Sequence, residues 1–163
     1  GFHINISVKS DDGTDHMDCM IAGILKNACA MTAFLNPAAD SYKRFGRNKA
    51  PLYVSWSDEN RSQLIRIPAA DGESRRAELR SPDPTANPYI AFALMIYAGL
   101  YGIENRVQLP DAVNVNLFKI DEKDVNGLEK LPVTLSEACK IAADSEFICG
   151  HLSKDIVDIY CSK

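Results

Sequence analysis

Apolar and polar side chains alternate over the first eight residues, and this alternation predicts a β-strand at residues 2–8. Side chains two positions apart lie on the same face of a strand. One face would therefore carry His3, Asn5 and Ser7, while the other carries four apolar side chains. The strand separates three groups that could contact a ligand from four that belong in a core.

A second pattern, in which apolar residues recur every three or four positions, predicts helices. The segments that show it are residues 15–36, 88–103, 135–143 and 153–160. Asn87 followed by Pro88 marks the start of the second helix, since asparagine caps helix N-termini and proline is tolerated in the first turn. Because this helix is apolar on every side from Tyr89 to Leu100, we expect it to be buried.

Further strand-like segments lie between the first two predicted helices, at residues 51–56, 63–67 and 76–80. The strands follow one another without an intervening helix, which favours antiparallel neighbours. We therefore predict an α+β fold with a mostly antiparallel sheet and helices packed on one side. A chain of 163 residues with 46% apolar residues is long enough to form one such domain.

Composition excludes several classes of protein. No apolar run reaches the 18 or so residues of a membrane span, and no charged leader precedes a short apolar stretch, so we expect a cytoplasmic protein without a membrane partner. The net charge of −4 gives no reason to expect nucleic acid as a partner. Five cysteines without a C-x-x-C pair argue against a disulfide framework or a zinc site, and we expect them in the core.

Arginines are concentrated in one part of this acidic chain. Seven of the eight lie between Arg44 and Arg80, and the segment 43–80 holds nine Lys or Arg against five Asp or Glu. The planar guanidinium binds phosphate and carboxylate groups through two parallel hydrogen bonds, so the segment indicates a small anionic ligand. A solvated basic face explains the same composition equally well.

The segment 76–80 places Arg76, Glu78 and Arg80 on one face of a strand. A carboxylate between two guanidiniums can be an exposed row of ion pairs with little effect on stability. Alternatively, Glu78 and His3 face one cleft and bind a hard divalent cation, with the arginines holding anionic oxygens around it. That arrangement would suit phosphoryl transfer, although the sequence contains no P-loop or dinucleotide motif.

Four blocks in a fixed order resemble the glutamine synthetases of the bacterial dodecameric type. They are Gly1-Phe2-His3 with Ser7; Asn36-Pro37 with Ser41-Tyr42-Lys43-Arg44; Asn60-Arg61-Ser62 with Ile65-Arg66-Ile67-Pro68; and Arg76-Ala77-Glu78-Leu79-Arg80 with Pro82-Asp83-Pro84-Thr85-Ala86-Asn87-Pro88-Tyr89. The resemblance is strong over residues 1–105 and thin beyond them.

The resemblance implies a reaction in which ATP phosphorylates glutamate to γ-glutamyl phosphate and ammonia then displaces the phosphate. It implies that His3 and Glu78 bind the divalent metal, Mg²⁺ or Mn²⁺, at the ATP phosphates. It also implies that Arg44 and Arg80 hold glutamate and the phosphoryl group being transferred.

Three more arginines would contact ATP in this family, namely Arg61, Arg66 and Arg76, with Ser7 near the nucleotide. The resemblance further makes Arg61 catalytic, together with the two arginines that hold glutamate. Four positions depart from the family pattern. Asn5 stands where a second histidine is usual, and Lys49, in a loop that is one residue shorter, stands where many relatives carry a glutamate. Glu73 lies near a position that is often basic in relatives, and Phe118 stands in place of the tyrosine that some bacterial relatives modify with AMP.

The resemblance also implies that residues 1–163 are a C-terminal fragment of the catalytic domain, without the N-terminal domain and the first part of the catalytic domain. We expect a homo-oligomeric parent enzyme, an inactive isolated fragment, and self-association through an unpaired strand edge. Two alternatives remain at this point: a ligase that joins glutamate to another amine, which the change at Lys49 motivates, and a non-catalytic assembly protein with the same scaffold.

Overall fold

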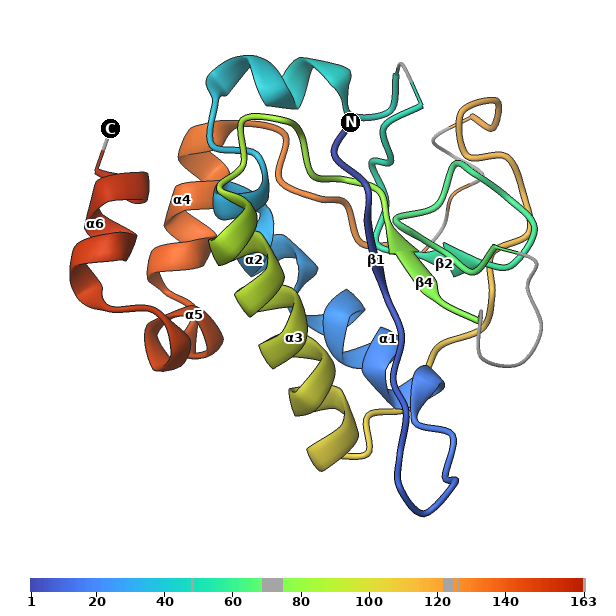
Figure 1. Cartoon of the computed structure of the whole chain (residues 1–163). Helices are drawn as coiled ribbons and strands as arrows, with labels where there is room; N and C mark the ends of the chain where they lie inside the picture. Colours follow the sequence, from blue (N-terminus) through green and yellow to red (C-terminus); the bar gives the residue numbers. More distant parts are fainter. Residues whose placement is uncertain (48, 69–74, 122–124, 126, 163) are drawn as a thin grey trace.

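The computed structural model describes residues 1–47, 49–68, 75–121, 125 and 127–162. The described part contains one small sheet and a group of helices (Figure 1). The strands are β1 (Ile4–Ile6), β2 (Trp56–Ser57), β3 (Ile65–Arg66) and β4 (Ala77–Leu79), and the helices are α1 (Met17–Lys26), α2 (Ala28–Leu35), the 3₁₀ helix η1 (Ala39–Arg44), α3 (Pro88–Glu104), α4 (Leu135–Ala143), α5 (Glu146–His151) and α6 (Lys154–Cys161).

The sheet has the strand order β1-β4-β3-β2. β4 pairs antiparallel with both β1 and β3, while β2 and β3 run parallel. Asn5 on one side and Arg66 on the other lie opposite Glu78. The predicted α+β fold with a mostly antiparallel sheet is confirmed. Residues 69–74, between β3 and β4, lie outside the described residues.

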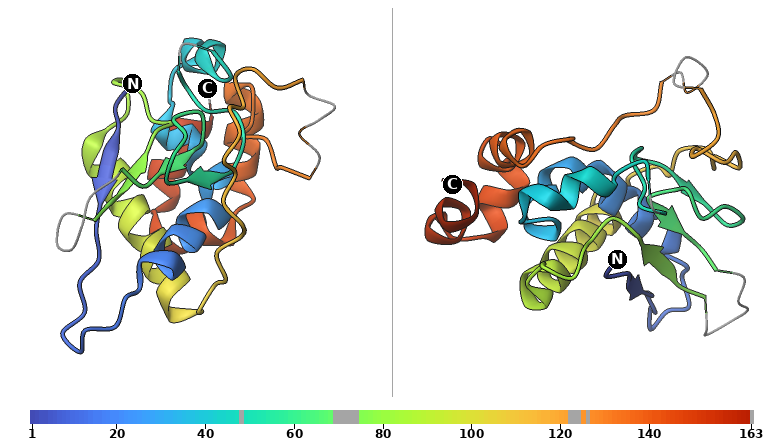
Figure 2. Two further views of the ribbon diagram at one scale, coloured as in Figure 1. Left: turned by 90° about the vertical axis from the view of Figure 1, so that its right-hand side faces the viewer. Right: turned by 90° about the horizontal axis from the view of Figure 1, so that it is seen from above.

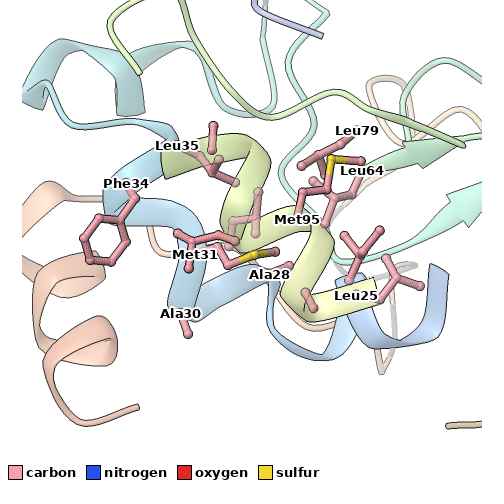
Figure 3. Close-up of a cluster of buried hydrophobic side chains, with 14 of the residues drawn as sticks. Leu25, Ala28, Ala30, Met31, Phe34, Leu35, Leu64, Leu79 and Met95 are labelled. Carbon is pink, nitrogen blue, oxygen red and sulfur yellow. The ribbon is translucent and has the colours of Figure 1, made fainter. Parts of the chain in front are cut away.

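The helices lie on one side of the sheet, as the two further views show (Figure 2). α1 packs across α3, and α2 packs against α4, with α5 and α6 beyond them. The core lies between the helices and the sheet, where Leu64 and Leu79 face Met95 of α3 (Figure 3). Met31 and Phe34 of α2 extend the same core toward the C-terminal helices.

Two glycines allow α1 and α3 to cross in close contact. A Cβ atom on Gly102 would lie 2.0 Å from the carbonyl oxygen of Cys19, and one on Gly23 would lie 2.2 Å from that of Ala98. Both distances are far shorter than any van der Waals contact, and the atoms met are backbone atoms. The crossing therefore depends on the absence of side chains at both positions.

The predicted single helix over residues 15–36 is wrong, because it is divided into α1 and α2 with a bend of 72°. Asn27 occupies the break, and both its backbone N–H and its side-chain amide donate to the carbonyl oxygen of Gly23. These bonds close the last turn of α1. The two halves also pack on different partners, α3 and α4, which a straight helix could not reach together.

The prediction that the helix beginning at Pro88 is buried is also wrong for one of its faces. Its N-terminus is confirmed, since the Asn87 side chain accepts hydrogen bonds from the backbone N–H groups of Tyr89 and Ile90. One face of α3 packs in the core, but large apolar side chains on the opposite face remain exposed.

α5 was not predicted, because six residues are too few to show a helical period.

The five cysteines do not all lie in the core as expected, since Cys149 is exposed and Cys139 alone is buried. Among the described residues, no single helix is long and apolar enough to cross a membrane, whereas α1 and α2 meet that test only as a bent pair.

Candidate active site

Glu78 lies at the centre of a cluster of polar side chains on the sheet. Its Oε1 is 3.3 Å from Nδ1 of His3, and its Oε2 accepts a hydrogen bond of 2.5 Å from a terminal nitrogen of Arg80. A terminal nitrogen of Arg66 lies 3.8 Å from the same Oε2. The strand register produces this cluster, because β1 and β3 both pair with β4 at or next to Glu78.

The two oxygens of the carboxylate therefore have different roles. Oε2 faces the two guanidiniums, whereas Oε1 faces the imidazole of His3.

The alternation of side chains predicted for residues 2–8 is confirmed, since His3, Asn5 and Ser7 are exposed while the four apolar side chains of this segment are buried or half-buried. This face of the sheet is thus polar, and the other face packs on the helices.

Arg80 is a buried cation, with a side chain only 4% exposed. Its Nε donates to the carbonyl oxygen of Arg61 at 3.1 Å, and its backbone N–H donates to that of Leu64 at 3.0 Å. The segment 61–64 therefore covers the guanidinium. The interpretation of residues 76–80 as an exposed row of ion pairs is wrong, because Arg80 and Glu78 are shielded from water.

The protonation states of His3 and Glu78 follow from these contacts. Burial lowers the pKa of His3, and the charge of Arg80 lowers it further, against the opposing effect of Glu78. Burial alone would raise the pKa of Glu78, but the hydrogen bond and charge of Arg80 outweigh burial and hold this pKa below its usual value. At neutral pH the site thus presents an ionised carboxylate next to a neutral imidazole, the forms in which both groups bind metals.

Arg44 lies at the end of η1 and is held by a separate set of acceptors. One terminal nitrogen donates to Oδ1 of Asn36 at 2.7 Å and to the carbonyl oxygen of Ser81, and Nε lies 3.9 Å from Oδ2 of Asp83. Ser81 follows Arg80 directly in the chain, so this cluster adjoins the end of β4. Burial lowers the pKa of Arg44, and the charge of Asp83 opposes that shift.

The remaining predicted ligand groups lie along β1. Nε of Arg76 donates to Oδ1 of Asn5 at 3.2 Å. Ser7 lines a cavity of about 420 Å³ formed by the residues that follow β1 and by Arg75. Arg75 is itself paired with Asp15 at 2.7 Å. The basic and polar groups thus extend from the Glu78 cluster along the strand to this cavity.

The donor set suits one corner of a divalent metal site. Two ligands at right angles on an ion with bonds of about 2.1 Å lie roughly 3.0 Å apart, close to the 3.3 Å between His3 Nδ1 and Glu78 Oε1. Across the described residues, no group of three or more His, Cys, Asp or Glu side chains is placed to hold a metal. An ion at this pair would therefore need further oxygen ligands, such as phosphate or water.

Comparison with known proteins gives the family of the chain. A model of the family described as "Glutamine synthetase, catalytic domain" matches residues 1–163. The chain belongs to the glutamine synthetase catalytic-domain family. It is 45% identical over 147 residues to a glutamine synthetase of Methanosarcina mazei, covering 88% of the chain and 33% of the relative, and 43% identical over 171 residues to one of Staphylococcus epidermidis, covering 96% of the chain and 38% of the relative.

The fold also resembles that of two solved structures. A complex of GmaS with ADP superimposes with a TM-score of 0.79 at 27% identity, and GmaS without ligand with a TM-score of 0.78 at 28% identity. Each match covers 96% of the chain and 36% of the solved chain. The chain thus spans about a third of the length of the glutamine synthetases and related structures that it matches.

The glutamine synthetase residues predicted from the sequence fall into groups in the fold. His3, Glu78, Arg66 and Arg80 come together. Arg61 contributes its backbone carbonyl to that cluster, while its side chain is exposed. The other predicted groups lie outside this cluster and occupy three places: Arg44 next to the end of β4, Arg76 beside Asn5, and Ser7 at the cavity after β1.

The sequence reasoning did not assign Asn36 and Asp83, the side chains that hold Arg44. Both lie in the blocks that carry the family resemblance, and both are buried, with exposed fractions of 0% and 5%. Buried polar side chains are rare unless they have partners. Their position in the sequence blocks that also carry the arginines was the signal that could have identified them.

Proposed function

We propose that this chain forms the C-terminal part of the catalytic domain of a cytoplasmic, homo-oligomeric glutamate–ammonia ligase. In the proposed reaction, the γ-carboxylate of glutamate attacks the terminal phosphorus of ATP and releases ADP. Ammonia then attacks the γ-carbonyl of γ-glutamyl phosphate, and phosphate leaves. The observation that carries this proposal is the Glu78 carboxylate held between the imidazole of His3 and the buried guanidinium of Arg80.

In this proposal, His3 and Oε1 of Glu78 hold Mg²⁺ or Mn²⁺, which would neutralise charge on the ATP phosphates. Arg80 fixes the carboxylate through Oε2, so that Oε1 remains directed at the imidazole. The proposed role of Arg66, beside the same carboxylate, is to contact phosphate oxygens with its remaining nitrogens.

The other arginines would bind anionic substrate groups. Arg44 has one terminal nitrogen in the contacts with Asn36 and Ser81, which leaves the other available for a carboxylate or phosphoryl oxygen. Arg80 would stabilise the charge on the phosphoryl group, and the exposed side chain of Arg61 and that of Arg76 would contact ATP phosphates, with Ser7 near the nucleotide. Glutamate, ammonia and ATP are the proposed ligands, and we expect neither nucleic acid nor a membrane as a partner.

Because the site has two protein metal ligands within the described residues, we propose that the 163-residue chain alone is inactive. The experiment is to measure Mn²⁺ binding to the chain by electron paramagnetic resonance, with and without ATP. We expect weak binding that ATP strengthens and that Glu78→Gln or His3→Ala reduces by about tenfold, a loss of roughly 1.4 kcal/mol.

His16→Ala is the matched control, since His16 caps α1 without a side-chain hydrogen bond and should leave Mn²⁺ affinity unchanged. Equal binding by the chain and by both site variants would refute the metal site. Formation of glutamine by the purified chain would refute the proposal that the chain alone is inactive.

A further inference from the structure

Two neighbouring polar side chains, Ser62 and Gln63, are buried, with exposed fractions of 2% and 0%. Oε1 of Gln63 accepts a hydrogen bond of 2.6 Å from the hydroxyl of Ser55. Its Nε2 donates to the carbonyl oxygens of Val113 at 2.6 Å and Val115 at 2.9 Å, so both hydrogens of the amide are used inside the protein. A buried amide whose bonds are all made is held in one orientation.

These side chains join residues 61–64 to the segment 113–117. The hydroxyl oxygen of Ser62 accepts from the backbone N–H of Leu117 at 2.9 Å, and this bond adds to the two that Gln63 makes there. Among the described residues, no backbone–backbone hydrogen bond links the two segments. The junction between them therefore depends on the bonds of two side chains.

Residues 61–64, the covering segment, also hold Arg80 through two backbone carbonyls. The carbonyl oxygen of Arg61 accepts from Nε of Arg80 at 3.1 Å, and that of Leu64 accepts from its backbone N–H at 3.0 Å. These two acceptors flank Ser62 and Gln63 in the chain. A shift of the covering segment would therefore move both acceptors and the guanidinium bonded to them.

We propose that Ser62 and Gln63 are positioning residues of the metal site. By holding the covering segment in place they fix Arg80, which in turn directs Oε1 of Glu78 at the imidazole of His3. Metal ligands bind best when the groups behind them are themselves held. The inference rests on the proposed function of the His3–Glu78 pair. It does not rest on any outer surface, because this chain alone buries Ser62 and Gln63.

A purely structural role is the alternative, since the loss of a buried hydrogen bond destabilises a protein wherever the bond lies. Gln63→Leu keeps a similar volume but leaves the carbonyl oxygens of Val113 and Val115 without their donor. Thr32→Val is the matched control. Thr32 is 1% exposed, and its hydroxyl donates to the carbonyl oxygen of Ala28 at 2.8 Å within α2, outside the Glu78 cluster.

The first measurement follows Arg80 without any metal. Its Nε–H should exchange slowly with solvent while it is buried and bonded to Arg61, and nitrogen-15 NMR measures the exchange rate. Urea is added to Thr32→Val until its free energy of unfolding equals that of Gln63→Leu. At equal stability, we expect exchange about tenfold faster or more in Gln63→Leu than in Thr32→Val.

The second measurement is the Mn²⁺ affinity in the presence of ATP, by electron paramagnetic resonance. Loss of a group that directly holds a metal ligand lowers affinity by about ten- to a hundredfold. Gln63 acts through the covering segment and Arg80, so we expect a smaller loss, about fivefold, in Gln63→Leu and none in Thr32→Val. In a Glu78→Gln background, Gln63→Leu should cause no further loss, because its effect on the metal passes through the Glu78 carboxylate.

A milder variant covers the case in which circular dichroism shows that Gln63→Leu does not fold. Ser62→Ala removes one bond of the same junction, and we expect both readouts to change in the same directions by about two- to threefold. Unchanged readouts in a folded Ser62→Ala variant would then overturn the inference.

The other outcomes separate this inference from the proposed function. Weaker Mn²⁺ binding in His3→Ala and Glu78→Gln, but not in Gln63→Leu, would overturn the positioning role alone. Unchanged binding in His3→Ala and Glu78→Gln would refute the metal site, and this inference with it. Equal Arg80 exchange in the two variants of matched stability, or a further loss of affinity in Glu78→Gln/Gln63→Leu, would overturn the positioning role as well.

Discussion

Replacing Glu78 by glutamine measures how much the negative charge of Glu78, paired with Arg80, contributes to stability. Glutamine has almost the same shape and keeps an oxygen that can accept from Arg80, but the compensating negative charge is lost. Arg80 would remain 4% exposed, bonded to the carbonyl oxygen of Arg61, and without a counter-charge at 2.5 Å. Removing one partner of a buried ion pair costs about 3–5 kcal/mol.

We expect Glu78→Gln to lower the free energy of unfolding by about 2–3 kcal/mol, at or just below the lower end of that range, because Glu78 is 14% exposed and the hydrogen bond is retained. Urea unfolding of the chain, followed by fluorescence, measures this free energy. The single tryptophan, Trp56, lies on β2 in the same sheet, so its emission reports on the region that changes.

The matched control is Asp40→Asn, which removes an ion pair with Lys43 of similar length, 2.6 Å. Both side chains of this pair are exposed, Asp40 to 84% and Lys43 to 78%. The urea midpoint of Asp40→Asn should not move, since exposed pairs contribute little. The double variant Glu78→Gln/Arg80→Met should be more stable than the sum of its single changes predicts, by about 1 kcal/mol or more. Equal effects of Glu78→Gln and Asp40→Asn, or strict additivity, would refute the reasoning.

Three further predictions concern the scaffold. In urea unfolding, Gly102→Ala should lower the free energy of unfolding by about 3 kcal/mol, because the new methyl group meets backbone atoms. Gly150→Ala is the control: nothing lies within 4 Å of its Cβ, so the change should be neutral or stabilising by up to about 1 kcal/mol. Similar changes in the two variants would contradict the close crossing of α1 and α3. Asn87→Ala should cost about 1 kcal/mol in thermal melts through loss of the α3 cap, and an unchanged melting temperature would argue against that cap. Burial would raise the pKa of Asp83, but the nearby Ser41 hydroxyl and the hydrogen bonds from Thr85 outweigh burial and lower this pKa. The contribution of Asp83 to stability is therefore present above the usual aspartate pKa and is lost as pH falls through the lowered value. Asp83→Asn should reduce the acid dependence of unfolding below about pH 4, and an unchanged slope would count against this role.

Features with local causes could be predicted from the sequence. The start of α3 depends on the Asn87 side chain and Pro88, which lie next to each other, and α4 occupies the predicted residues 135–143. The contact between His3 and Glu78 required more, namely strand alternation together with the family resemblance. The alternation indicated which side chains share a face, while the resemblance indicated that the two strands are neighbours.

Features that depend on distant partners could not be predicted. The helical period continues across Asn27, so the sequence does not show that α1 and α2 turn toward different helices. Apolar composition indicated that α3 avoids water, but not which of its faces the rest of the chain covers. Arg80 looked like a surface cation because the segment that buries it, residues 61–64, lies far from it in the chain.

The crossing of α1 and α3 restricts how these two helices can diverge among related sequences. Any replacement of Gly23 or Gly102 adds at least one carbon atom, so either change forces the helix axes apart. Once the axes have separated, the second glycine is no longer needed for clearance, and its replacement becomes much less harmful. The two positions should therefore be lost together or kept together during evolution, and a sequence that retains only one of them marks an unstable intermediate.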